Sequence, residues 1–194
     1  MNEIKIWDAF IRIAHWLMVF GFAAAYLSEG DPMWLHSWAG YLIVAVVLLR
    51  VFWGFVGPEH ARFANFVKSP RAVFAYLGDL ARFRSKRFVG HSPAGGAMTI
   101  ALLVLLVATA TFGMMDLALT KGLGPLSPWL QPDAAVTAAV AAGQRVRGPF
   151  KDVHELFANL TLAFVILHLC GVALASFAHR ENLPRAMVTG RKRP

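Results

Sequence analysis

Four long apolar stretches constrain this chain more than any other feature of its sequence. They run from about Phe10 to Leu27, Leu35 to Val56, Gly96 to Met115 and Phe150 to Phe177. A helix needs about 20 predominantly apolar residues to cross the hydrocarbon core of a bilayer. Hydrophobic residues make up 57% of the chain and charged residues only 15%, against roughly 25% charged residues in soluble domains. We therefore predict an all-α membrane protein, a bundle of four transmembrane helices.

The four helices and their connectors use up the 194 residues, so we predict a single membrane-embedded domain spanning residues 1–194. The first stretch holds His15 and Trp16 and is followed by no convincing cleavage site, so we expect it to stay in the mature protein. Cys170 is the only cysteine, which excludes an intrachain disulfide and a cysteine cluster for iron–sulfur or zinc.

Basic residues are concentrated in two parts of the chain, and this distribution predicts its orientation. Residues 57–95 contain seven Lys or Arg residues and the tail after the last stretch contains five, whereas the short connector "SEGDPMW" has none. Cytoplasmic loops of membrane proteins carry an excess of Lys and Arg. We therefore expect both termini on the cytoplasmic side of a bacterial inner membrane, in contact with lipid. This placement accounts for the net charge of +8, and nucleic acid is not an expected partner.

Two connectors contain patterns typical of short helices. The segment "SPRAVFAYLGDLARF" starts with a Ser cap and a first-turn proline and has apolar residues at helical spacing, which predicts a helix at about 69–83. Such a helix could lie on the membrane surface or pack as an ordinary amphipathic connector on the bundle. The connector from Asp116 to Asp152 is expected on the outer side, and its segment "PDAAVTAAVAAG" predicts a helix that begins at Pro132.

Four histidines lie inside the apolar stretches, in two pairs matched by depth. His154 and His168 are fourteen residues apart, so on one helix they project from nearly the same face, about 21 Å apart. His15 lies near the start of the first helix, and His36 lies near the start of the second, which runs the opposite way. We therefore expect His15 at the inner level with His168, and His36 at the outer level with His154.

These two pairs favour haem binding. Ionisable side chains inside a membrane are costly and usually serve a cofactor, a proton path or a substrate. A b-type haem supplies four equatorial nitrogens and requires only axial ligands, commonly imidazoles from facing helices. Two haems b would use His15 and His168 on the inner iron and His36 and His154 on the outer iron. A histidine hydrogen-bonded between helices is the alternative for any single one, and a bare zinc or copper ion needs three or four ligands at one point.

Two arginines are expected near the inner pair. Arg50 lies fourteen residues after His36, on the same face of the second helix, and Arg12 lies three residues before His15. Either guanidinium could pair with a haem propionate, whose charge would offset the cost of placing it near the membrane interior. Snorkelling toward lipid phosphates is the alternative, chiefly for Arg12.

The remaining aromatic and histidine residues at the segment ends are expected at the membrane interface. Tryptophans near helix ends are typical of an aromatic belt; these are Trp7, Trp34, Trp38, Trp53 and Trp129. Three histidines fall in or beside the cytoplasmic connectors and are also predicted to be interfacial: His60, His91 and His179.

The chain resembles the bacterial cytochrome b561 family, which includes the membrane cytochrome b subunits of nickel–iron hydrogenases and is similar to the cytochrome subunit of formate dehydrogenase. The resemblance covers nearly the whole chain and rests on "WDAFIRIAHW", "LHSWAGYLIVAVVLLRVFWGFVGPEHARFANF", "GHSPAGG", "HELFANLTLAFVILHLCGV" and "HRENLPRAMVTGRK". It implies that His15, His36, His154 and His168 are the axial ligands of two haems b. Family members move electrons between a quinone pool and a partner redox protein.

We therefore expect a dihaem electron carrier that works between membrane quinone and a redox partner outside, such as a periplasmic c-type cytochrome. The inner level, with Arg12, Arg50, Trp16 and Trp53, is where we expect the quinone. Two alternatives stay open, a quinone-coupled haem reductase of superoxide or ferric iron, and a haem-free transporter whose histidines relay protons. A homodimer is compatible with the sequence.

Overall fold

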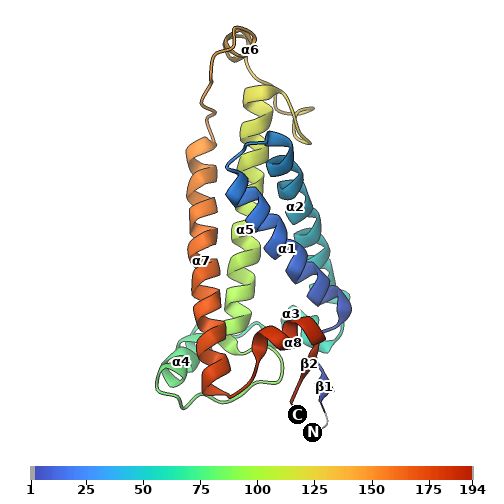
Figure 1. Ribbon diagram of the computed structural model, residues 1–194, viewed down its shortest axis with the longest axis vertical. Coiled ribbons are helices and arrows are strands. Elements are labelled where there is room, and N and C mark those ends of the chain that lie inside the picture. The colour runs from blue at the N-terminus through green and yellow to red at the C-terminus, as the bar shows by residue number, and fades with distance from the viewer. Residues whose placement is uncertain (1–2, 194) are drawn as a thin grey trace. The chain divides into compact units, whose positions relative to one another are not determined.

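The computed structural model describes residues 3–193, and the chain folds as two compact units (Figure 1). The first unit contains the chain up to Leu103 together with the chain from Ala163 onward, and the second contains Val104–Leu162. Two long helices, α5 (Pro93–Lys121) and α7 (Lys151–Ala178), begin in one unit and end in the other.

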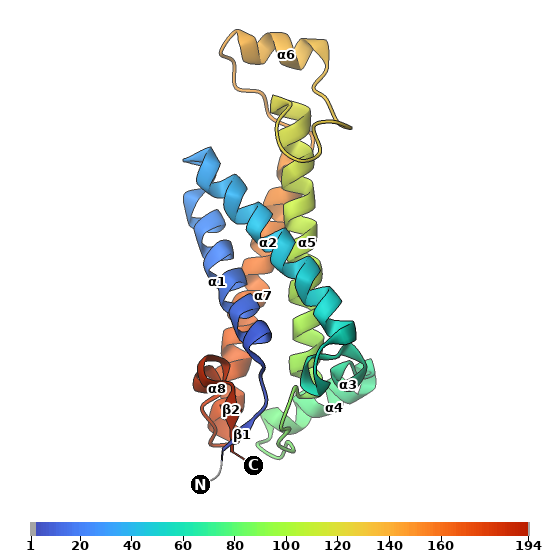
Figure 2. The same ribbon diagram turned by 90° about the vertical axis from the view of Figure 1, so that its right-hand side faces the viewer.

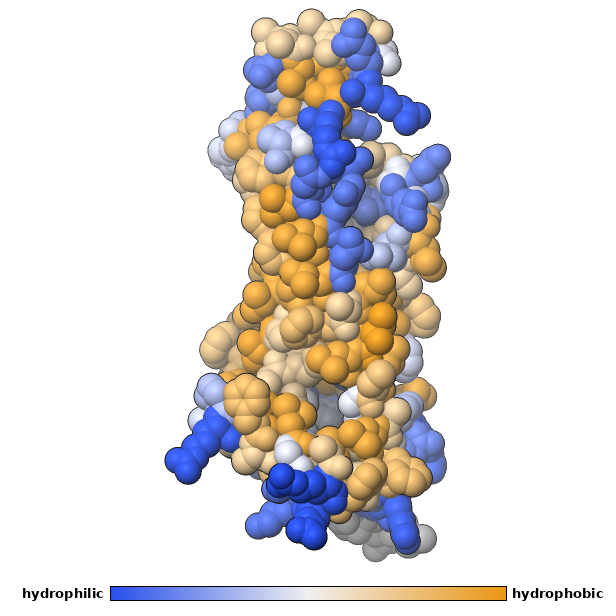
Figure 3. Space-filling model, turned by 90° about the vertical axis from the view of Figure 1, so that its left-hand side faces the viewer, coloured by the Kyte–Doolittle hydropathy of each residue, from blue (hydrophilic) through white to orange (hydrophobic). Residues whose placement is uncertain are grey.

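The four apolar stretches are four long helices, each apolar enough to cross a membrane. They are α1 (Ala9–Ser28), α2 (Met33–Val56), α5 and α7. The chain is thus a multi-pass membrane protein with four candidate spans. Hydrophobic side chains dominate the middle of the face drawn in Figure 3, as expected where a surface meets lipid rather than water. The largest difference from the predicted bounds is in α5, which continues six residues past Met115.

Helices α1 and α2 form an antiparallel hairpin within the first unit (Figures 1 and 2). The Asp8 side chain caps α1 by accepting a hydrogen bond from the Ile11 amide, and its other oxygen accepts one from Trp53 Nε1 near the end of α2. Gly21 allows close packing, because a Cβ there would lie 3.1 Å from Ile43 Cγ1. These contacts set the register in which the two helices face each other.

Short elements follow α2 in the first unit: the 3-10 turn η1 (Glu59–Ala61), α3 (Phe63–Phe66) and α4 (Pro70–Ala81). The start of α4 agrees with its sequence signals, because Ser69 Oγ accepts a hydrogen bond from the Ala72 amide and Pro70 occupies the first turn. The helix stops two residues before the predicted end, and Phe83 just beyond it has a left-handed φ of 56°.

The ends of the described chain are paired with each other, which the all-α prediction did not include. Strand β1 (Ile4–Lys5) pairs antiparallel with β2 (Arg191–Lys192), just after α8 (Leu183–Thr189). A small hydrophobic core lies beside this pair; it contains Ile6, Trp7, Ile11, Ala61 and Ala186. Trp7 is only 6% exposed, so its prediction as part of an aromatic belt is wrong.

An ion cluster lies in the C-terminal part of the first unit. The buried Glu181 carboxylate pairs with Arg87 Nη2 at 3.0 Å and with Lys192 Nζ at 3.5 Å. Burial by itself would raise the pKa of Glu181, but the hydrogen bond from Arg87 and the charge of Lys192 outweigh it and hold that pKa below its usual value. Glu181 therefore stays charged and holds β2 to the connector before α5.

The second unit joins the later part of α5 to the earlier part of α7. Phe112 on α5 stacks on Phe157 of α7, with ring centroids 5.3 Å apart. About one turn before Phe112 on α5 and one turn after Phe157 on α7, the hydroxyls of Thr109 and Thr161 lie 3.1 Å apart. The connector between them holds α6 (Ala134–Ala141), capped by Asp133, where the sequence predicts a helix that begins at Pro132.

Close packing of α5 against α3 makes Gly96 a critical position. A Cβ at Gly96 would lie 2.6 Å from the backbone oxygen of Phe66, which cannot rotate away. We expect Gly96→Ala to destabilise the protein by about 1–3 kcal/mol, measured as a lower thermal unfolding temperature in detergent. Gly78→Ala on α4 is the control, because a Cβ at Gly78 meets nothing within 4 Å. Equal effects of the two substitutions would contradict this packing.

Candidate functional site

The inner pair of histidines comes together within the first unit. His15 lies on α1 and His168 in the second half of α7, and the two imidazoles are close enough for their charges to interact. The His15 ring packs edge-on against Trp16, with centroids 5.2 Å apart. Its Nδ1 is buried and has no hydrogen-bond partner among residues 3–193. A buried imidazole nitrogen without a partner indicates that this level is built to receive another group.

His36 is fixed by the backbone of the neighbouring helix. Its Nδ1 lies 2.8 Å from the carbonyl oxygen of Ala25 on α1. A carbonyl oxygen can only accept a hydrogen bond, so Nδ1 carries the proton and donates it. When the imidazole is neutral, its lone pair therefore lies on Nε2, a ring nitrogen that can bind a metal.

His154 is fixed in the same way within the second unit. Its Nδ1 donates to the carbonyl oxygen of Thr109 on α5, at 2.8 Å. Gly113 on α5 lies beside the ring, and a Cβ there would be 2.8 Å from His154 Cε1. Sequence reasoning missed Gly113 and both carbonyl partners, because each lies on a different helix from its histidine.

These histidines are suited to a cofactor that brings most of its own ligands. A histidine that ligates a metal commonly donates its second ring N–H to a backbone carbonyl, which fixes its tautomer and orientation. Within residues 3–193 no three His, Cys, Asp or Glu side chains gather as a metal site. Single imidazoles, in their neutral form, are suited to the axial positions of a haem. The pairing of His36 with His154 stays a prediction.

Arg50 is a buried cation about one helical turn from the level of His15. The contacts of Ala25 with His36 and of Asp8 with Trp53 set the register of the two antiparallel helices, in which His15 lies opposite residue 46 of α2. Arg50 follows residue 46 by one helical turn, so it lies about 6 Å further toward the C-terminal end of α2. Its side chain is 4% exposed, and its Nη1 is buried without a hydrogen-bond partner.

The guanidinium of Arg50 stacks on the rings of Phe63 and Phe66, 5.1 and 5.9 Å from their centroids. Stacking satisfies the face of the guanidinium, and the charge of Asp8 lies near it, but Nη1 still has no hydrogen-bond partner among residues 3–193. A buried guanidinium with an unpaired N–H favours an anionic group beside it.

Arg12 is held by the C-terminal segment. Its Nη1 donates to the carbonyl oxygen of Val188 at 2.6 Å, and its Nε is buried without a partner. A Cβ at Gly190 would lie 3.1 Å from that Nε, so the residue after α8 packs directly against the guanidinium. Arg12 thus points toward α8, while its buried Nε retains an unused donor.

His91 packs among aromatic rings inside the protein, whereas its sequence position predicts a place at the membrane interface. It comes just before α5, which starts with a Ser92 cap on the Gly95 amide, and the sequence places it at the interface. Its ring packs against Phe66 at 4.2 Å and edge-on to Trp7 at 4.7 Å, and its Nδ1 is buried without a partner. Burial, and secondarily the nearby positive charges, lower its pKa to about 3.

The fold and these side chains define a class of protein. Four apolar spans carry histidines of a kind that can ligate haem and arginines with buried, unpartnered nitrogens that can pair with carboxylates, a combination expected of a membrane cytochrome b.

The particular family follows from comparison with known sequences. Residues 6–190 match the family described as prokaryotic cytochrome b561, and the chain belongs to this family. Membership implies a membrane cytochrome with haem b that takes part in transmembrane electron transfer.

Three relatives share nearly the full length of the chain. The chain is 23% identical to the "Probable Ni/Fe-hydrogenase B-type cytochrome subunit" of Rhizobium leguminosarum bv. viciae, an alignment that covers 98% of this chain and 89% of the relative. It is 26% and 25% identical to proteins of the same name from Azotobacter chroococcum mcd 1 and Azotobacter vinelandii, with 97% of this chain and 88% of each relative covered. No solved structure matches the chain significantly.

The depressed pKa of His91 predicts a pH-dependent stability. The unfolded chain binds a proton at this histidine near pH 6.5, whereas the folded protein resists protonation until about pH 3 because burial, Arg50, Lys192 and His60 oppose it. As the pH is lowered from about 6.5 to about 3, the free energy of unfolding should therefore fall by about 1.4 kcal/mol for each pH unit. We expect His91→Gln to flatten this part of a plot of unfolding temperature against pH. An unchanged slope in the variant would show that His91 is not the group responsible.

Proposed function

We propose that this protein is a dihaem electron carrier of the bacterial inner membrane, with both termini in the cytoplasm. Membership of the cytochrome b561 family supports haem b and electron transfer. The observation that carries the proposal is the orientation of His36 and His154, each of which donates Nδ1–H to a backbone carbonyl and so has its lone pair on Nε2. A haem-free proton relay would not need this fixed tautomer.

His15 and His168 are the proposed axial ligands of the inner haem iron, and His36 and His154 those of the outer haem iron. The closeness of the two imidazoles in the first unit supports the inner assignment. When bound, haem b supplies an iron that accepts and donates single electrons. The four histidines would hold this group in place, and the side chains around them would tune its potential.

Arg50 and Arg12 are the proposed partners of the inner propionates. Both carry a buried guanidinium nitrogen without a partner in the described chain, and a carboxylate would satisfy it. The apolar rings around Arg50 exclude water, which strengthens such a pairing.

Electrons are proposed to pass between membrane quinone at the inner level and a redox protein outside, such as a c-type cytochrome. Arg12, Arg50, Trp16 and Trp53 are the residues proposed to flank the quinone. The names of the three relatives support a redox protein as the partner, since all three are called hydrogenase cytochrome subunits. Moving one electron across the whole membrane potential changes its energy by about 2.3 kcal/mol per 100 mV, so the partner and the potential together determine direction.

The ligand assignment predicts haem stoichiometry. Purified protein should contain two haems b per chain, and His168→Ala should retain one, because the inner iron loses an axial ligand while the outer pair is untouched. The measurement is the pyridine haemochrome spectrum normalised to protein. His60→Ala is the matched control, since this histidine lies in η1, outside the four long helices.

The variants separate the two levels as well. His154→Ala should also retain one haem, with a reduced spectrum and a midpoint potential different from those of His168→Ala. Haem content that is unchanged in both variants, or wild-type protein without haem absorption, would contradict the assignment.

The quinone step predicts direct reduction of haem by a quinol. A short-chain quinol analogue should reduce the wild-type haem in stopped-flow absorbance, and Arg50→Gln should slow this step by about tenfold, the effect of losing one charged hydrogen bond. Arg71→Gln on α4 carries the same charge change in an exposed position and should behave as wild type. Haem content is measured alongside. Failure of the quinol to reduce a fully loaded wild-type protein would count against the quinone assignment.

A further inference from the structure

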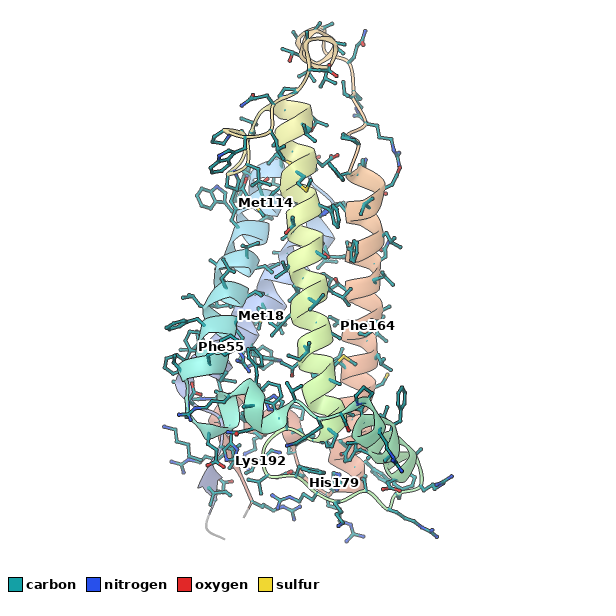
Figure 4. The ribbon with its side chains drawn as sticks, turned by 180° about the vertical axis from the view of Figure 1, so that it is seen from behind. Met18, Phe55, Met114, Phe164, His179 and Lys192 are labelled. Carbon is teal, nitrogen blue, oxygen red and sulfur yellow. The ribbon has the colours of Figure 1, made fainter. Side chains whose placement is uncertain are left out.

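A pocket with a volume of about 500 Å³ lies at the end of α7, within the first unit. Its lining residues are Phe83, Ser176, Phe177, Ala178 and Arg180. Phe83 comes from the connector after α4, and the other four come from the last turn of α7 and the residues directly after it. Figure 1 shows α4 beside this end of α7, and Figure 4 shows His179 in the same region.

The two walls of the pocket are tied together by named contacts. Phe83 and Phe177 meet edge-on, with ring centroids 6.1 Å apart. His179 Nε2 lies 3.4 Å from both Tyr76 Oη on α4 and Ser85 Oγ on the following connector. The pocket is therefore a built feature of the fold and not a gap between unconnected segments.

The pocket opens beside a strongly apolar surface. Phe177 is 76% exposed and Phe83 60% exposed, and Phe74 on the neighbouring α4 is 73% exposed. These side chains lie at the end of a membrane-spanning helix and on an amphipathic helix with a cap at its start. Exposed aromatic rings in this position are suited to contact with acyl chains at the bilayer surface.

The charges around the pocket are unbalanced. Arg180 lines it, and Arg82, Arg84 and Lys86 lie on the connector that also supplies Phe83. None of these four cations forms a salt bridge among residues 3–193. The nearby Glu181 is already paired with Arg87 and Lys192. The surplus of positive charge favours an anionic occupant.

Ser176 provides a polar group in the pocket wall that the fold leaves unused. A Ser or Thr inside a helix commonly donates its hydroxyl to the carbonyl four residues earlier. In this chain Thr109, Thr120 and Thr161 do so, at 2.6–2.8 Å. The Ser176 hydroxyl is buried and makes no such hydrogen bond among the described residues.

We propose that this pocket binds the headgroup of an anionic phospholipid. Arg180 pairs with the phosphate, the Ser176 hydroxyl turns to donate to a phosphate or ester oxygen, and the acyl chains lie along Phe83 and Phe177. A neutral quinone would match the aromatic walls but not the unpaired cations, and free phosphate would match the cations but not the exposed rings. The site requires only the membrane-spanning fold and does not depend on the haem or quinone assignments.

The test titrates the purified, haem-loaded protein in detergent with phosphatidylglycerol and counts bound lipids by native mass spectrometry. We expect saturable binding of phosphatidylglycerol, with thermal stabilisation, and neither effect with phosphatidylcholine of the same acyl chains or with inorganic phosphate. Arg180→Gln should weaken phosphatidylglycerol binding by about fivefold. Ser176→Ala should weaken it by a smaller factor, without a change of charge.

Arg84→Gln is the matched control, because it removes the same charge from the same surface but from a residue that does not line the pocket. Equal weakening by Arg84→Gln and Arg180→Gln would show a general electrostatic attraction and overturn the site. Equal affinity for phosphatidylglycerol and phosphatidylcholine, displacement of the lipid by a short-chain quinone, or saturable binding of inorganic phosphate alone would also overturn it. The haem spectrum, recorded on each sample, separates these outcomes from a failure of the haem assignment.

Discussion

The cost of a polar nitrogen inside a membrane governs how this protein is arranged. Each imidazole N–H in the hydrocarbon requires an acceptor, and the only abundant acceptors there are backbone carbonyls already used by helices. His36 and His154 solve this by reaching a carbonyl on a neighbouring helix, Ala25 in one case and Thr109 in the other. The same contact that satisfies one nitrogen leaves the other with its lone pair. At each site a single hydrogen bond therefore satisfies a buried polar group and fixes the orientation of the imidazole ring.

At the level of His15 the buried polar groups are not all satisfied by residues 3–193 of the protein. His15, Arg12 and Arg50 all hold a buried nitrogen without a partner in the described chain, and Arg50 is stacked between aromatic rings. A level with several unpartnered polar nitrogens is less complete as a protein core than one whose polar groups are all hydrogen-bonded. It is suited to completion by a cofactor with carboxylates of its own. The stability of this part of the molecule should accordingly be linked to what it binds.

Local signals in the sequence predict where the helices lie. The features that the sequence does not predict depend on contacts between residues far apart in the chain. Apolar length predicts the four long helices, and Ser69 with Pro70 predicts the start of α4, because capping depends on residues a few positions apart. The burial of His91 depends on Trp7 and Phe66, both far away in the sequence. The partner of His154 lies forty-five residues earlier. Helical periodicity predicts the face on which a histidine lies, but it cannot identify the carbonyl on another helix that the side chain meets.

The pairing of β1 with β2 has a consequence for the connectivity of the chain. Residues near both ends lie side by side, joined by strand hydrogen bonds and by the contact of Arg12 with Val188 (Figures 1 and 2). Because the register pairs Ile4 with Lys192, a short peptide that joins these two residues would close the chain between them into a ring. Such a protein is a natural candidate for circular permutation, with new ends opened in the exposed connector around α6. The order in which the helices are synthesised could then be changed while their neighbours in the fold stay the same.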